Sequence, residues 1–108
     1  MICVTAGIDE LSFEGPIQVG HVVRLEARVT ATFRTSLEVF VDVRGERPST
    51  RETWPCVSGY LTFVGLRDGS PAAVPQLLVE TSAEAAAVAA ARARREARLA
   101  RRTVHRGS

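Results

Sequence analysis

The chain has 108 residues, of which 45% are hydrophobic and 24% are charged, and its formal net charge is +2. These values are typical of one globular domain. No apolar run approaches the roughly 20 residues of a membrane-spanning helix, and a cytoplasmic protein is expected. Cys3 and Cys56 are too few and too far apart for a disulfide framework or a metal site, and both thiols are expected to be reduced and buried.

The first half of the chain predicts strands. Residues 2–8 have the pattern of a strand, and residues 9–20 form a connection that contains Gly and Pro as breakers. Residues 21–31 and 35–44 alternate apolar and polar side chains with a period of two. That alternation over such a length predicts two long strands, each with one face toward water.

The reversal between these two strands contains none of the residues that usually make tight turns, namely Gly, Asn, Asp or Pro. It carries Phe33, Arg34, Thr35 and Ser36 instead, which place a cation and two hydroxyl groups beside an aromatic ring. Two interpretations stay open at this point. The three polar side chains bind an anionic ligand, or Thr35 and Ser36 begin a strand while Arg34 faces water.

The middle of the chain predicts a hairpin loop and a third long strand. Residues 45–53 form a polar loop, and residues 54–66 form the strand, in which Gly59 indicates a bend or bulge. Residues 67–80 contain three turn signals and are expected to be irregular.

The last part of the chain predicts a helix. Residues 81–84, Thr-Ser-Ala-Glu, have the pattern of a capping box, and an Ala- and Arg-rich segment continues to about Arg102. Residues 81–108 hold seven Arg and two acidic residues, whereas residues 1–80 hold seven Arg and ten acidic residues. We interpret the helix arginines as a solvated face, and nucleic-acid binding is not expected, because no aromatic residue lies among them to stack on bases.

The expected architecture is α+β, with several antiparallel strands followed by one helix. The apolar face of such a sheet must be covered by a helix or by a second sheet. The predicted helix has only Val88, Leu99 and Val104 as large apolar residues, and burying each is worth roughly 1.5–3 kcal/mol. The cover for the sheet is therefore expected to come from elsewhere.

Five segments, in this order, are similar to segments of the hotdog-fold acyl-CoA thioesterases, in the cytosolic acyl-CoA hydrolase family. The likeness extends over about residues 3–100. The matching segments are VTA at 4–6, PIQVG at 16–20, RTSLEV at 34–39, YLTFV at 60–64 and PQLLVET at 75–81. The chain departs from the family pattern at His21, where Asp is usual, at Phe33, where Gly is usual, and at Gly65, where Ala is usual.

The resemblance implies a curved antiparallel sheet of the hotdog type with a C-terminal helix. Family members also have a first strand and a long central helix upstream of the VTA strand, and the sequence begins after these elements. Residues 1–80 are therefore expected to be an N-terminally incomplete hotdog domain, and residues 81–108 a C-terminal helix and tail. The central hotdog helix is expected to be missing from this chain.

The resemblance further implies hydrolysis of a fatty acyl-CoA to the free acid and CoA, in a homo-oligomer and without a cofactor. Thioester hydrolysis needs backbone N–H groups for the oxyanion and a carboxylate or amide for the water, and in the family both belong to the central helix. No catalytic residue and no metal ligand is therefore assigned here. Asp9, Glu10 and Glu14 are interpreted as solvated loop charges.

The same resemblance places the reversal beside the groove where CoA enters. Arg34 is then expected to pair with a phosphate, and Thr35 and Ser36 to bond the pantetheine or a phosphate. By family the chain is an enzyme, yet the 108 residues alone are expected to show weak or no turnover. The alternative is a catalytically inactive hotdog module that binds or assembles with a complete partner.

Overall fold

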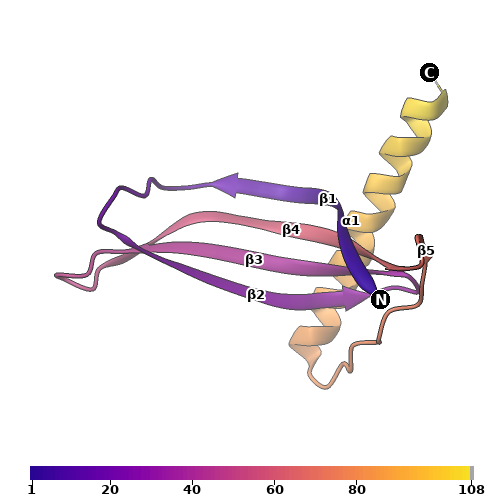
Figure 1. Cartoon of the computed structure of the whole chain (residues 1–108), viewed down its shortest axis with the longest axis horizontal. Coiled ribbons are helices and arrows are strands. Elements are labelled where there is room, and N and C mark those ends of the chain that lie inside the picture. The colour runs from indigo at the N-terminus through magenta and orange to yellow at the C-terminus, as the bar shows by residue number, and fades with distance from the viewer. Residues whose placement is uncertain (108) are drawn as a thin grey trace.

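The computed structural model describes the backbone of residues 1–107 and the side chains of residues 1–101. The strands lie in one antiparallel sheet in the order β1-β4-β3-β2, and β5 pairs with the end of β4 (Figure 1). The predicted α+β class, with an antiparallel sheet and a C-terminal helix, is confirmed. The elements are β1 (Ile2–Phe13), β2 (Val22–Thr32), β3 (Ser36–Glu46), β4 (Thr53–Arg67), β5 (Ser70–Pro71) and α1 (Ser82–Gly107).

Strand β1 extends beyond the predicted range of 2–8, because a bulge lets the strand continue. The register with β4 shifts between Asp9 and Ser12, and Glu10 takes a left-handed backbone conformation with φ of 50°. Gly59 of β4 lies opposite this irregularity, and a Cβ built there would lie 3.2 Å from Cδ1 of Leu11. The irregularity predicted at Gly59 is thus a bulge in the neighbouring strand β1. Gly59 leaves room for that bulge because it has no side chain.

The capping box predicted at the start of the helix is confirmed, whereas the segment 67–80, expected to be irregular, begins with a short hairpin. Asp68 and Gly69 both have positive φ, 53° and 79°, which closes a two-residue hairpin between β4 and β5. The backbone N–H of Glu84 donates to Oγ1 of Thr81 at 3.1 Å, and the backbone N–H of Thr81 donates to Oε1 of Glu84 at 3.0 Å. This reciprocal pair is a complete capping box, so α1 begins at Ser82.

Helix α1 lies against the polar face of the sheet. Strand β3 directs Glu38, Phe40 and Asp42 to this face and Val39 and Val41 to the other, as the pairing with β4 shows. Figure 1 shows α1 passing behind the strands near the end of the sheet where β2 ends. Within the described residues, no helix combines the length and the apolar character needed to cross a bilayer.

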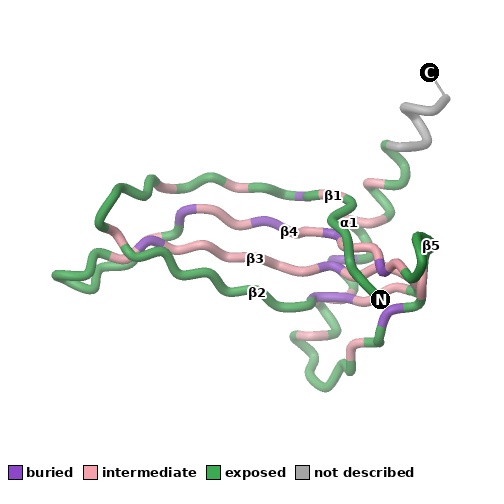
Figure 2. Tube along the Cα trace, viewed as in Figure 1, coloured by how far each residue is buried: buried purple, intermediate pink, exposed green. Residues whose placement is uncertain are grey.

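The apolar face of the sheet is left without a helix by the described residues. Ile8, Val23, Leu25 and Val29 point to this face and have exposed fractions of 54%, 46%, 66% and 42%. Figure 2 accordingly shows most of β1 and β2 as exposed. Among the described side chains, the buried apolar residues are Ala31, Cys56, Val74 and Ala91. The prediction that α1 does not cover this face is confirmed.

The two cysteines differ in exposure. Cys56 is buried within β4, whereas Cys3 is exposed, so the prediction of a buried thiol was wrong for Cys3. The physical reason is that Cys3 lies on the edge strand β1, which pairs with β4 on one side only.

Candidate functional site

The reversal at residues 33–36 is closed by backbone hydrogen bonds from three directions. The N–H of Phe33 donates to the carbonyl of Ser36 at 2.8 Å, which closes the turn itself. The N–H of Gly65 donates to the carbonyl of Thr35 at 2.9 Å, and a further bond comes from the segment after β5. These tertiary donors stabilise a turn that lacks the usual turn residues.

The segment after β5 holds the reversal from the side. The N–H of Val74 donates to the carbonyl of Arg34 at 3.1 Å, and Nε2 of Gln76 donates to the carbonyl of Phe33 at 2.9 Å. The N–H of Leu77 donates to Oγ1 of Thr32 at 3.0 Å, at the end of β2. The backbone of the reversal is therefore fixed on the side that faces residues 74–77.

The side chains of the reversal are uncommitted. Arg34 is exposed, and Thr35 and Ser36 are half-buried. Within the described part of the chain, these three side chains take part in no hydrogen bond or ion pair. The structure therefore brings the three predicted binding residues together, with one guanidinium and two hydroxyl groups free to meet a ligand.

Glu38, two residues after Ser36, anchors α1 to the sheet. Nε and Nη2 of Arg94 donate to the two oxygens of the Glu38 carboxylate at 3.0 and 2.7 Å, and Oγ1 of Thr30 donates to Oε1 at 2.6 Å. The guanidinium of Arg94 also lies over the ring of Tyr60, with Cζ 3.5 Å from the ring centre. The hydrogen bonds to Glu38 raise the pKa of Arg94 above its ordinary value.

A second ion pair lies beside the first, on β1. Nη1 of Arg98 donates to Oδ2 of Asp9 at 2.8 Å and to Oγ1 of Thr62 at 2.9 Å, and Nη2 of Arg101 donates to Oδ1 of Asp9 at 3.2 Å. Asp9 is 8% exposed. The interpretation of Asp9 as a solvated loop charge was wrong, because β1 continues through it and α1 covers it.

The arginine face of α1 is likewise not solvated as a whole. The side chains of Arg94 and Arg98 are 12% and 16% exposed, and both donate to carboxylates of the sheet. Arg92, by contrast, is exposed as expected. Arg102 and His105 lie outside the residues whose side chains the structure describes.

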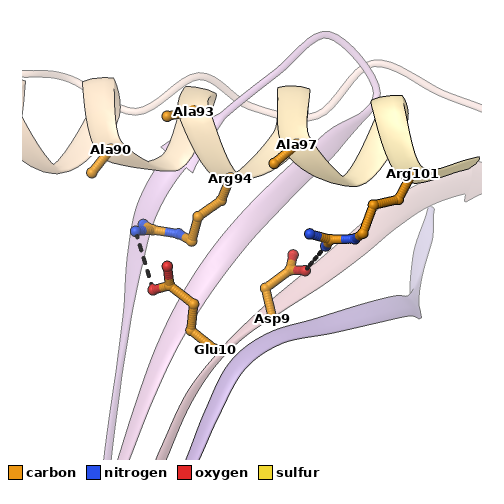
Figure 3. A pocket seen from close by; sticks show the side chains of 7 residues that line it. All are labelled: Asp9, Glu10, Ala90, Ala93, Arg94, Ala97 and Arg101. Carbon is orange, nitrogen blue, oxygen red and sulfur yellow. Dashed lines mark hydrogen bonds and ion pairs between the residues drawn. The ribbon is translucent and has the colours of Figure 1, made fainter.

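A groove of about 420 Å³ runs between β1 and α1 and contains both acidic residues of the bulge. Figure 3 shows Asp9 and Glu10 extending from β1 toward Arg101 and Arg94 of the helix. Oε2 of Glu10 lies 3.8 Å from Nη1 of Arg94, and its side chain is 61% exposed. Both carboxylates thus neutralise arginines, so this groove is not assigned the general base of a hydrolase.

Phe33 contacts α1. Cζ of Arg95 lies 5.0 Å from the centre of the Phe33 ring, which is within the range of a cation–π contact. The bulky side chain that stands where the family usually has Gly thus contacts the helix.

His21 is half-buried. Its Nδ1 accepts a hydrogen bond from the N–H of Gln18 at 3.0 Å, and its ring meets Trp54 edge to face at 4.8 Å. It therefore stabilises the turn before β2. Among the described residues, no group of three or more His, Cys, Asp or Glu could hold a metal ion.

Comparison with known proteins identifies the family. The family model described as the thioesterase superfamily matches residues 1–51. The uncharacterized acyl-CoA thioester hydrolase YkhA of Bacillus subtilis is 40% identical over 82 residues, which are 75% of this chain and 48% of that protein. The chain spans from 16% to 50% of the length of the curated relatives described in the same comparison.

Solved structures agree with this likeness. A hexameric acyl-CoA thioesterase matches with a TM-score of 0.83 at 38% identity, over 92% of this chain and 64% of that chain. The acyl-CoA hydrolase of Staphylococcus aureus in complex with butyryl-CoA and CoA matches with a TM-score of 0.81 at 33% identity, over 97% of this chain and 65% of that chain. In another structure of that hydrolase, the match covers 67% of the solved chain at 32% identity. The chain therefore belongs to the thioesterase superfamily, with the hotdog fold of the acyl-CoA thioesterases.

Proposed function

We propose that residues 1–80 are a hotdog acyl-CoA thioesterase domain, and residues 81–108 its C-terminal helix and tail. The domain hydrolyses fatty acyl-CoA to the free acid and CoA when a helix covers the apolar face of the sheet. The proposal rests on two features of the same sheet: an apolar face that the described residues leave uncovered, and three uncommitted polar side chains at the reversal between β2 and β3.

CoA binding is proposed at the reversal. Arg34 forms a charge-assisted pair with a phosphate, and the hydroxyls of Thr35 and Ser36 bond the pantetheine or the same phosphate. The support is that these groups are free and that the backbone beneath them is fixed by Gly65 and Val74. The S. aureus hydrolase, whose structure is described as a complex with CoA, is similar over nearly the whole of this chain.

The catalytic groups are proposed to reside on the covering helix. Its N-terminal N–H groups would stabilise the oxyanion, and a carboxylate or amide on it would activate water. In the described residues the most buried carboxylates, Asp9 and Glu38, are both bound by arginines of α1 on the opposite face. The apolar residues Val39 and Leu61 would instead pack under the covering helix.

Assembly into a homo-oligomer is proposed through strand β2. This strand pairs with β3 on one side, and its other edge carries no strand from the described residues. An unpaired edge of this length is a template for a strand from a second copy. Similar structures are described as hexameric. We also propose a cytoplasmic location, since a human relative, 34% identical over 84 residues, is called cytosolic. A role in fatty acid metabolism is proposed from the substrate, a fatty acyl-CoA.

A second candidate function is a binding or assembly module without catalysis. The observation that favours it is the pairing of Asp9 and Glu38 with arginines, which leaves neither carboxylate free to act as a base. In this alternative the sheet binds CoA or a complete partner, and no acyl-CoA is hydrolysed.

The test of CoA binding is calorimetry with Arg34→Ala and a matched control. A lost charge-assisted hydrogen bond is worth roughly 1.5–3 kcal/mol, so the Kd for CoA should rise about tenfold or more. Arg92→Ala removes an exposed arginine of α1 and should leave the Kd unchanged. If both variants bind CoA like the parent chain, the proposed site is wrong.

A further inference from the structure

The helix α1 reaches the reversal at residues 33–36 through two consecutive arginines. Arg94 binds the Glu38 carboxylate in a bidentate pair, with hydrogen bonds of 3.0 and 2.7 Å. Arg95 lies over the ring of Phe33, with Cζ 5.0 Å from its centre. One residue thus contacts the strand just after the reversal, and the other contacts the reversal itself.

We propose that Arg94 and Arg95 position the reversal for CoA, and this inference rests on the proposed function. Neither residue touches CoA in this arrangement. Arg94 acts through Glu38, and Arg95 acts through Phe33. The helix α1 therefore contributes to CoA binding, although it lies on the opposite face of the sheet from the proposed catalytic helix.

The connection from Glu38 to the binding groups is short and stiff. Ser36 and Glu38 lie on the same face of β3, two residues apart, which is a separation of roughly 7 Å along the strand. The Glu38 carboxylate is 3% exposed and is fixed by Thr30 as well as by Arg94. A shift of Glu38 therefore moves Ser36, and displacements of about 1 Å matter for binding groups.

The opposite side of the reversal supplies a probe of its position. The N–H groups of Gly65 and Val74 donate to the carbonyls of Thr35 and Arg34 at 2.9 and 3.1 Å. Their hydrogen exchange reports whether the reversal stays in place, and it does so without any ligand.

The experiment compares Arg95→Ala, Arg95→Lys and Arg94→Lys with the control Arg92→Ala, in the full chain. Each variant is examined by hydrogen exchange and by calorimetry with CoA. Arg95→Ala should accelerate exchange at Gly65 and Val74 about tenfold and raise the Kd for CoA about fivefold, with the melting temperature within a few degrees of the parent.

The two conservative variants separate positioning from general stability. Arg95→Lys keeps a cation over Phe33 and should restore most of the affinity for CoA. Arg94→Lys keeps the charge but loses the bidentate fork, and should weaken CoA binding and accelerate exchange to an intermediate degree. Arg92→Ala should match the parent chain in both measurements.

The outcomes distinguish this inference from the proposed function. Unchanged hydrogen exchange at Gly65 and Val74 in Arg95→Ala would overturn the inference, whether or not the Kd for CoA changes. If Arg34→Ala weakens CoA binding and Arg95→Ala does not, the inference fails and the proposed function stands. If the parent chain fails to bind CoA, or Arg34→Ala binds it normally, both fail.

Discussion

Removing the positive partner of Glu38 should destabilise the fold more than removing the whole pair. In Arg94→Met, a carboxylate that is 3% exposed keeps only the hydroxyl of Thr30 as a side-chain donor. Breaking a buried pair from one side costs about 3–5 kcal/mol, and the 12% exposure of Arg94 places the expected loss near the lower end.

The double variant Glu38→Leu/Arg94→Met provides the contrast. Thr30 then loses the carboxylate, but its hydroxyl keeps the backbone carbonyl of residue 38, to which it already donates at 3.2 Å. Replacing both charges with apolar side chains of similar size is often nearly neutral, so the double variant should lie within about 1 kcal/mol of the parent.

Equilibrium urea unfolding, followed by the fluorescence of Trp54, measures both changes. An Arg94→Met chain that is already unfolded without urea agrees with the expectation, since small domains are only marginally stable. The reasoning would be refuted if Arg94→Met lost less than about 0.5 kcal/mol in the free energy of unfolding and the double variant were less stable than Arg94→Met. The Glu38 carboxylate would then not be buried as described.

Three further predictions concern single sites. Gly45→Ala should cost about 1–3 kcal/mol in urea unfolding, because a Cβ there would lie 2.6 Å from the ring of Trp54; an unaltered midpoint would contradict that packing. Thr81→Ala removes the capping hydroxyl of α1 and should lower the free energy of unfolding by about 1 kcal/mol, with a smaller helical signal in far-UV circular dichroism. An unchanged spectrum and an unchanged urea midpoint would show that the cap does not stabilise the helix. Cys3 should react with a thiol reagent in the native chain while Cys56 reacts only after unfolding, and equal rates would contradict their difference in burial.

Features that depend on neighbouring residues were predictable from the sequence. The capping box at Thr81 and Glu84 formed as expected, because both partners lie within one helical turn. The alternation at 21–31 and 35–44 likewise predicted β2 and β3 to within a few residues, since the side-chain period of a strand is a local property.

Features that join distant segments were not predictable. Asp9 and Arg98 lie 89 positions apart, and Glu38 and Arg94 lie 56 apart, so no local pattern connects them. The bulge at Glu10 interrupts the period-two pattern of β1, so the sequence pattern around Asp9 indicates a loop although the strand continues.

The candidate site shows the same division. The unusual composition of the reversal indicated Arg34, Thr35 and Ser36 as binding residues, because turn chemistry could not explain them. The support beneath them could not be read from the sequence, since it comes from Gly65 and Val74. The resemblance to a family supplied the ligand for which those side chains are proposed.

The most direct test of the account is thiol release from palmitoyl-CoA by the purified 108-residue chain. The oxyanion donors and the water-activating group are proposed to lie on a helix that covers the apolar face, outside the described residues. The chain alone should therefore release little or no thiol above the background of the buffer, even at concentrations at which it binds CoA. Robust turnover by the chain alone would contradict the account.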